Sequence, residues 1–307
     1  MSKDIIFMLG CPRSGTTFLN SLIRDEMDVG FGPELQMIPK YYKKKRHYGD
    51  LSDRNNFSRL IQDMLKERYF YILENNYSEK LGVKIKITKE HIISQAPELS
   101  LSGAIYGILK STADVLGKKH VGNKHLAMLL HPDWMEELFP NCRVINVIRD
   151  GRDCALSLTK TRWGHTNTYA AATFWAKNID NGRMLAKKYQ NGRYMELRYE
   201  DFLQKPEEEA YRLWRFINNQ NKTENGHKSF SHISSQVRAG NSNKWKDKMS
   251  VRDIAIFQNI AGEQLRVNGY EIAPCTQKLY FFQKWYYALE NEIHREYKVR
   301  FKNKLRK

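Results

Sequence analysis

The residues best suited to chemistry lie in GCPRSGTT, residues 10–17, which combines two glycines, an arginine and two threonines. An apolar run precedes this segment and FLNSLI follows it at helical spacing, so the pattern predicts a strand, a loop and a helix. Successive backbone N–H groups of such a loop, together with the positive end of the following helix, form a site for an anion. The segment therefore predicts a loop that holds a phosphate-like group.

The loop differs from the triphosphate-binding motif GxxxxGK[ST] at a position that decides the ligand. Gly10, Gly15 and Thr17 are in register with that motif. Thr16, however, stands at the lysine position, and Arg13 lies inside the loop. A lysine reaches the β- and γ-phosphates beside Mg²⁺, whereas an arginine with two hydroxyls can grip a terminal group without a metal. We therefore expect a nucleotide that does not end in a triphosphate, and no metal ion.

A second segment, RVINVIRDGRDCALSLTK at residues 143–160, repeats the arrangement. An apolar strand over 144–148 leads through a polar turn into a helix that is expected to begin near Asp153. Arg149 at the strand end and Ser157 in the helix can hold a phosphate through charge-assisted and hydroxyl hydrogen bonds. Two such loops in one chain imply a ligand with two separated anionic ends.

The pair PRSGTT and RDGRDCALS resembles the two motifs by which sulfotransferases hold 3′-phosphoadenosine 5′-phosphosulfate (PAPS). Four further segments occur in the order found in the tyrosylprotein sulfotransferases and their bacterial relatives, and they resemble those proteins: GPELQMIPK, VGNKHLAMLLHPDWMEELFPN, MELRYEDFLQKPEEE and NKWKDKMSVRDIAIFQNIAGEQLRVNGYE. The resemblance covers most of residues 4–272. It implies a PAPS-dependent O-sulfotransferase.

The resemblance also implies roles for individual residues. The first loop takes the 5′-phosphosulfate, the second takes the 3′-phosphate, a tyrosine in RYEDF lies near the adenine, and SHISSQVRAG resembles a late loop that closes over the nucleotide. The implied nucleotide-binding residues are Arg13, Ser14, Gly15, Thr16, Thr17, Arg149, Ser157, Tyr199, Ser235 and Arg238. The implied catalytic residues are Glu34, Lys124, Arg13 and Ser234, with Lys124 matching a family lysine that contacts the leaving oxygen.

Glu34 is the candidate general base. It lies in GPELQMIP, similar to the GEExxxIP context of the family's catalytic glutamate, and a carboxylate near the mouth of the first loop can accept a hydroxyl proton. Pro33 stands where relatives carry another acid, so one carboxylate remains in the motif. Some cytosolic sulfotransferases use a histidine instead, and His125 beside Lys124 is the rival base.

The alternation of strands and helices predicts an α/β fold, in which a P-loop-like central parallel sheet carries helices on both faces. We expect one sulfotransferase domain over 1–275, with a helical insertion on the acceptor side at 40–118. The basic, aromatic segment 276–307 is expected to form a C-terminal helix that packs its aromatic face on the domain and leaves a basic end in solvent. A membrane-surface or partner-binding helix is the alternative, and a homodimer also stays open.

The composition of the chain indicates which kinds of partner to expect. The 307 residues carry a formal net charge of +17, which attracts polyanions such as PAPS itself. The candidate acceptor hydroxyls are those of a peptide tyrosine, a sugar or polysaccharide, and a small-molecule natural product. Nucleic acid is not expected, because no nucleic-acid-binding motif accompanies the charge. The four cysteines lack CxxC spacing and indicate neither a zinc site nor a disulfide framework.

Two other functions remain as alternatives. A nucleotide kinase or NTPase would use the same loop architecture, but it would need a loop lysine and an acidic metal ligand where Thr16 and Arg149 stand. A non-catalytic polyanion-binding protein would explain the charge but not two ordered anion loops. No run of about 18 apolar residues occurs, and the first residues enter a strand directly. We therefore expect a cytoplasmic enzyme, unless an anchor has been removed from the chain.

Overall fold

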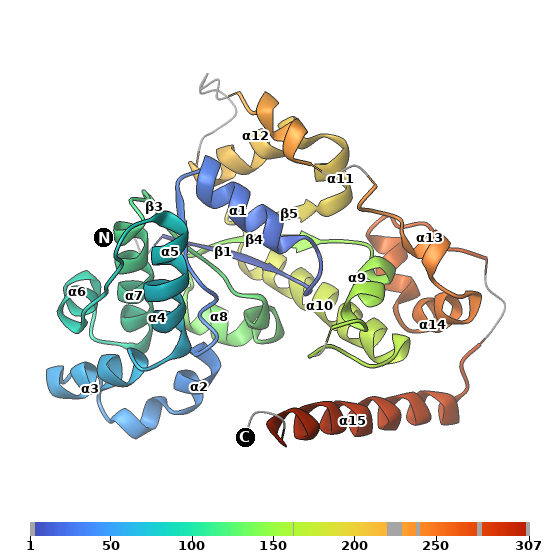
Figure 1. The fold of residues 1–307 in the computed structure, drawn as a ribbon, viewed down its shortest axis with the longest axis horizontal. Helices are drawn as coiled ribbons and strands as arrows, with labels where there is room; N and C mark the ends of the chain where they lie inside the picture. The colour runs from blue at the N-terminus through green and yellow to red at the C-terminus, as the bar shows by residue number, and fades with distance from the viewer. Residues whose placement is uncertain (1–3, 162, 220–228, 238–239, 275–277, 305–307) are drawn as a thin grey trace.

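A computed structural model describes residues 4–161, 163–219, 229–237, 240–274 and 278–304, with the side chains of 297–304 left out (Figure 1). Five strands form one sheet, and every neighbouring pair is parallel. The strands are β1 (Ile5–Gly10), β2 (Val29–Phe31), β3 (His120–Lys124), β4 (Arg143–Ile148) and β5 (Tyr194–Arg198), in the spatial order β2-β3-β1-β4-β5. The α/β fold with a parallel sheet, expected from the sequence, is confirmed.

Helices surround the sheet (Figure 1). In chain order they are α1 (Thr16–Glu26), α2 (Ile38–Lys43), α3 (Arg54–Met64), α4 (Arg68–Ile72), α5 (Ser78–Leu81), α6 (Lys89–Gln95), α7 (Leu101–Val115), α8 (Pro132–Leu138), α9 (Gly151–Leu158), α10 (Thr168–Lys188), α11 (Tyr199–Gln204), α12 (Pro206–Ile217), α13 (Trp245–Lys248), α14 (Val251–Val267) and α15 (Phe281–Lys304). Shorter helical turns are η1 (Lys45–Tyr48), η2 (Leu73–Tyr77), η3 (Leu126–Leu130) and η4 (Ser231–Gln236).

The alternation of side chains along β1 shows how both faces of the sheet are covered. Ile5 and Phe7 join a core cluster with residues of α3, α6 and α7, whereas Ile6 and Met8 join a second cluster with residues of α1 and α12. Successive strand residues point to opposite faces, so a strand that is apolar throughout must be buried on both. The sheet is thus an internal layer, and its loops reach solvent at the edges.

The carboxyl ends of β1 and β4 lie next to each other, because Gly10 pairs in register with Val147. Parallel strands place the loops that follow them at one edge of the sheet, where α/β proteins bind ligands. The helix after β4 begins at Gly151, two residues earlier than expected near Asp153. The reason is a cap: the carboxylate of Asp150 accepts a hydrogen bond of 2.9 Å from the Arg152 N–H.

The C-terminal helix packs differently from the sequence-based expectation. Figure 1 shows α15 running along the outside of the molecule, next to α10, with which it makes its contacts. Tyr287 and Asn291 are buried, whereas the large apolar side chains Phe281, Phe282 and Trp285 are exposed. The expectation that the aromatic face packs on the domain is therefore wrong. Within the described part of the chain, no helix has the length and apolarity needed to cross a bilayer.

Candidate active site

The loop between β1 and α1 has a backbone that few residues could adopt. Gly15 has φ of +88°, and a Cβ atom there would lie 2.2 Å from a ring carbon of Tyr199. Arg13 also has a positive φ, +77°, which strains a residue with a side chain. Ser14 is fully buried, and its hydroxyl donates to the Cys11 carbonyl at 2.7 Å. The loop is thus held in one shape, with the Ser14 hydroxyl acting as a brace inside it.

Arg149, at the end of β4, connects three segments of the chain. Its guanidinium donates to the carbonyl of Arg13 at 3.1 Å, to the carbonyl of Asn241 at 2.7 Å and to the carboxylate of Asp153 at 3.2 Å. It also lies 5.0 Å from the centre of the Tyr199 ring. Its Nε is buried and has no acceptor among the described residues. A buried donor of this kind is suited to an anionic ligand.

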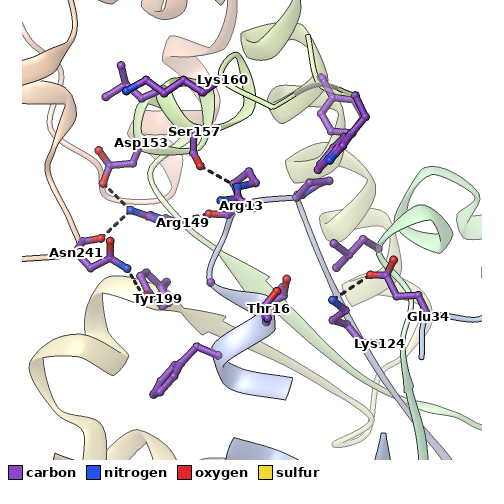
Figure 2. A pocket seen from close by; sticks show the side chains of 18 of the residues that line it. Arg13, Thr16, Glu34, Lys124, Arg149, Asp153, Ser157, Lys160, Tyr199 and Asn241 are labelled. Carbon is purple, nitrogen blue, oxygen red and sulfur yellow. Dashed lines mark hydrogen bonds and ion pairs between the residues drawn. The ribbon is translucent and has the colours of Figure 1, made fainter. Parts of the chain in front are cut away.

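The two loops that the sequence predicts to bind anions are in direct contact. Arg13 Nε donates to Ser157 Oγ on α9 at 2.8 Å. On the opposite side of Arg149, the amide of Asn241 donates to the Tyr199 hydroxyl at 2.8 Å, and Lys244 donates to the Asn241 side-chain oxygen at 2.7 Å. Residues distant in sequence therefore form one polar network around the carboxyl ends of β1 and β4 (Figure 2).

Glu34 and Lys124 form an ion pair of 3.3 Å at the other side of the same cavity (Figure 2). Lys124 is the last residue of β3, and Glu34 follows β2, so the two side chains come from neighbouring strands. Asn123 fixes the segment that carries Glu34. Its amide donates to the Pro33 carbonyl at 2.8 Å, and its oxygen accepts from the Leu35 N–H at 3.3 Å. The backbone is thus clamped on both sides of Glu34.

These groups line a single cavity of about 1160 Å³. Of the residues implied by the motifs, the cavity is lined by Arg13, Gly15, Thr16, Thr17, Glu34, Lys124, Arg149, Ser157 and Tyr199. Sequence reasoning did not single out seven polar lining residues, namely Ser21, Gln36, Asp153, Lys160, Asn241, Lys244 and Lys248. All of them except Asn241 lie in segments already quoted: Lys160, for example, lies in the second motif, and Lys244 and Lys248 lie in the segment that begins with NKW. A count of cations in those segments could have found the three lysines.

One part of the cavity wall is apolar. It is formed by Leu126, Ala127 and Leu130 of η3, by Leu156 of α9, and by Trp163 and Phe174. Trp163 is also exposed to solvent. The cavity therefore combines a cationic region, suited to phosphates, with a wall that can contact an apolar group.

Three expected residues do not line the cavity: Ser14, which is fully buried in the first loop, and Ser234 and Ser235. Ser234 and Ser235 lie on η4, where both are exposed; Ser234 donates to the Glu207 carboxylate at 3.0 Å, and Ser235 donates to the His232 carbonyl at 2.8 Å. Neither lines the cavity. Arg238 lies outside the described residues. The segment that closes the network is instead the one carrying Asn241 and Lys244, a few residues later.

His125, the rival base, is buried and does not line the cavity. Burial lowers the pKa of its imidazole to about 4. Of the two candidate bases, Glu34 is therefore the one that faces the cavity.

Residues 4–221 match the model described as the sulfotransferase family. A protein of Caenorhabditis briggsae named "Putative protein-tyrosine sulfotransferase" is 25% identical over 219 residues, covering 70% of this chain and 65% of that protein. The "Protein-tyrosine sulfotransferase" of Drosophila melanogaster is 24% identical over 221 residues, covering 69% of this chain and 38% of that protein. The chain thus spans less than two thirds of the length of either relative.

Two solved structures share the fold. The sulfotransferase domain from the curacin biosynthetic pathway aligns with a TM-score of 0.53 and 18% identity, covering 88% of this chain and 99% of that domain. The sulfotransferase domain of the Synechococcus PCC 7002 olefin synthase aligns with a TM-score of 0.51 and 19% identity, covering 84% and 94%. These alignments extend the likeness in fold beyond the residues matched by the family model.

The shape of the first loop predicts an unusual sensitivity at Gly15. Gly15→Ala adds a Cβ at a positive φ and against the Tyr199 ring, so it should lower the free energy of unfolding by about 2–4 kcal/mol. Gly82→Ala is the matched control, because Gly82 also has a positive φ, +65°, but nothing lies within 4 Å of an added Cβ. That control should cost about 1 kcal/mol. Equal losses for the two variants in urea unfolding would show that Tyr199 does not confine the loop.

The buried imidazole of His125 predicts a pH dependence of stability. Its pKa is about 4 in the folded protein against an ordinary value of 6.5, so between these values the unfolded chain binds more protons. Stability should therefore fall as the pH drops from 6.5 to 4, by about 3 kcal/mol from this residue. Urea unfolding across that window should show a smaller loss for His125→Gln. An imidazole that titrates near pH 6.5 by NMR would contradict the burial.

Proposed function

The chain belongs to the sulfotransferase family, as its motifs led us to expect, and we propose that it transfers a sulfuryl group from PAPS to an acceptor hydroxyl. The observation that carries the proposal is the single cavity that joins both anion-binding loops to Glu34 and Lys124. PAPS, when bound, supplies the sulfuryl group and becomes 3′-phosphoadenosine 5′-phosphate (PAP). The residues of this protein would bind the nucleotide, neutralise charge on the leaving phosphate and remove the acceptor proton.

The residues around the two loops fit such a nucleotide. The loop carrying Arg13 and the first N–H groups of α1 would hold the 5′ end, since a helix N-terminus favours an anion. Arg149, with its unpaired Nε, and Ser157 would hold the 3′-phosphate. The lysines of the cavity wall, Lys160, Lys244 and Lys248, add positive charge for a ligand that carries several negative charges. Tyr199 would lie beside the adenine.

Glu34 and Lys124 would carry the chemistry between them. A transfer of this type needs the two oxygens in line, charge neutralised on the leaving phosphate, and the acceptor proton removed, by analogy with phosphoryl transfer. The Lys124 ammonium would neutralise the leaving oxygen, and the Glu34 carboxylate would accept the hydroxyl proton. Their ion pair orients both side chains, and the Asn123 clamp fixes the backbone of the base.

The apolar wall supports a phenolic acceptor. The wall residues of η3, together with Trp163 and Phe174, can contact the ring of a phenol better than the hydroxyl-covered surface of a sugar. The two relatives, which are named protein-tyrosine sulfotransferases, also support a tyrosine-like hydroxyl. We therefore propose a peptide tyrosine or another phenol as the acceptor, in preference to a polysaccharide or an aliphatic alcohol.

The assignment of Arg149 predicts a selective loss of affinity. Arg149→Ala should weaken PAP binding by roughly 10- to 100-fold, because a charge-assisted hydrogen bond to the 3′-phosphate is lost. Adenosine 5′-phosphosulfate, which lacks that phosphate, should lose less than about threefold. Calorimetry in EDTA measures both, and PAP should bind the wild type tightly without a metal.

Asp153→Asn should have an intermediate effect on PAP affinity, and it therefore also tests the assignment of Arg149 to the 3′-phosphate. Asp153 contacts Arg149 and accepts from the Trp245 N–H at 2.9 Å, so its loss should loosen Arg149 without removing it. Its effect on PAP should lie between those of the wild type and Arg149→Ala. Equal losses for the two nucleotides, or an absolute need for Mg²⁺, would refute the assignment. Tighter binding of ATP than of PAP would instead favour a P-loop kinase.

If Glu34 is the general base, its substitution should lower turnover without changing nucleotide affinity. Glu34→Gln keeps the size of the side chain but cannot accept a proton, so turnover should fall by about 10²- to 10⁴-fold while PAP affinity stays near the wild-type value. Lys124→Ala should also lower turnover, through the leaving group. Initial rates with PAPS and 4-nitrophenol measure both, and Glu137→Gln, an exposed carboxylate, is the matched control. Near-normal turnover in Glu34→Gln together with inactivity of His125→Ala would identify the histidine as the base.

A further inference from the structure

The helix α15 attaches to the rest of the molecule by a polar face. Asn291 is 4% exposed, and its side-chain oxygen accepts from the Thr166 N–H at 3.0 Å. The amide of Asn167 donates to the Tyr287 carbonyl at 2.8 Å and to the Glu290 carboxylate at 2.9 Å. Both partners lie just before α10, and Asn167 is the residue that caps the N-terminus of that helix. The contacts fix which side of α15 faces the protein.

The opposite side of α15 is apolar and open to solvent. Six side chains with exposed fractions between 43% and 85% lie on it: Phe281, Phe282, Trp285, Tyr286, Leu289 and Ile293. The other five lie one, four, five, eight and twelve residues after Phe281. This spacing places all six on one face of a helix, about half a turn from Tyr287 and Asn291. A contiguous apolar face of this size on a protein surface marks an interaction site.

The charge of the same segment indicates the chemistry of the partner. Residues 278–307 contain nine lysines and arginines against three glutamates, and seven of those cations lie at 295–307. The aromatic residues come first and the cations follow. Aromatic side chains beside clustered Lys and Arg are the composition of helices that lie at the surface of an anionic bilayer.

We propose that α15 docks this protein on anionic lipid bilayers. The aromatic face enters the boundary between head groups and acyl chains, where Trp and Tyr are favoured, and the positive charge that the sequence carries at 295–307 attracts the anionic head groups. A second copy of the chain fits less well, because two molecules of net charge +17 repel each other whereas an anionic bilayer attracts each. The proposal does not depend on the catalytic assignment.

The loop that holds α15 is also connected to the cavity. It contacts α15 through Thr166, and it carries Trp163, which lines the cavity and is exposed.

Flotation of the full chain with lipid vesicles tests the proposal. Vesicles of phosphatidylcholine with about one third phosphatidylserine should bind the protein, vesicles of phosphatidylcholine alone should bind it far less, and raising the salt should release it. The double variant Phe282→Glu/Trp285→Glu should bind at least about tenfold more weakly, because two buried aromatic side chains are replaced by anions.

Controls separate this effect from misfolding and from self-association. Tyr71→Glu changes an exposed aromatic residue on another helix and should leave vesicle binding intact. PAP binding of the double variant should equal that of the wild type, which shows that the cavity is folded. Sedimentation without lipid should give a monomer. A dimer that the double variant dissociates would identify a second copy as the occupant, and equal vesicle binding by the wild type and the double variant would overturn the proposal.

Discussion

The buried guanidinium of Arg149 is the interaction on which the nucleotide end of the cavity depends. A charge taken out of water is costly unless acceptors surround it, and here those acceptors come from the first loop, from α9 and from the segment around Asn241. The need to satisfy one cation therefore joins Arg149 to partners that lie 4, 92 and 136 positions away along the chain. Its Nε has no acceptor among the described residues.

The second part of the site follows from the parallel sheet. Glu34 follows β2 and Lys124 ends β3, and these strands are neighbours, so their carboxyl ends bring acid and base together. The order β2-β3-β1-β4-β5 then places the ion pair on one side of the first loop and Arg149 on the other (Figure 2). One edge of one sheet thus separates the region that we propose for phosphate binding from the region that we propose for proton transfer.

The sequence predicted those features that depend on residues close to one another along the chain. Apolar runs, glycine spacing and polar turns located both anion loops and the strands before them, and the parallel sheet and the family were predicted correctly. Contacts between distant segments were not predictable: the Asn241 network joins residues 42 to 92 positions apart, and Ser234 and Ser235 were expected in its place. The composition of 276–307 predicted a basic, aromatic helix, but it could not show that Asn291 and Tyr287 would form the side that faces the protein. The roles of the individual site residues stay predictions.

The central claim is that this cavity moves a sulfuryl group from the nucleotide to a hydroxyl, and one measurement tests it most directly. The protein is incubated with PAPS and a phenol in EDTA, and all products are quantified by mass spectrometry. The account predicts one molecule of PAP for each molecule of sulfated phenol, with ATP left intact under the same conditions. PAPS that remains unchanged while ATP is converted to ADP would contradict it.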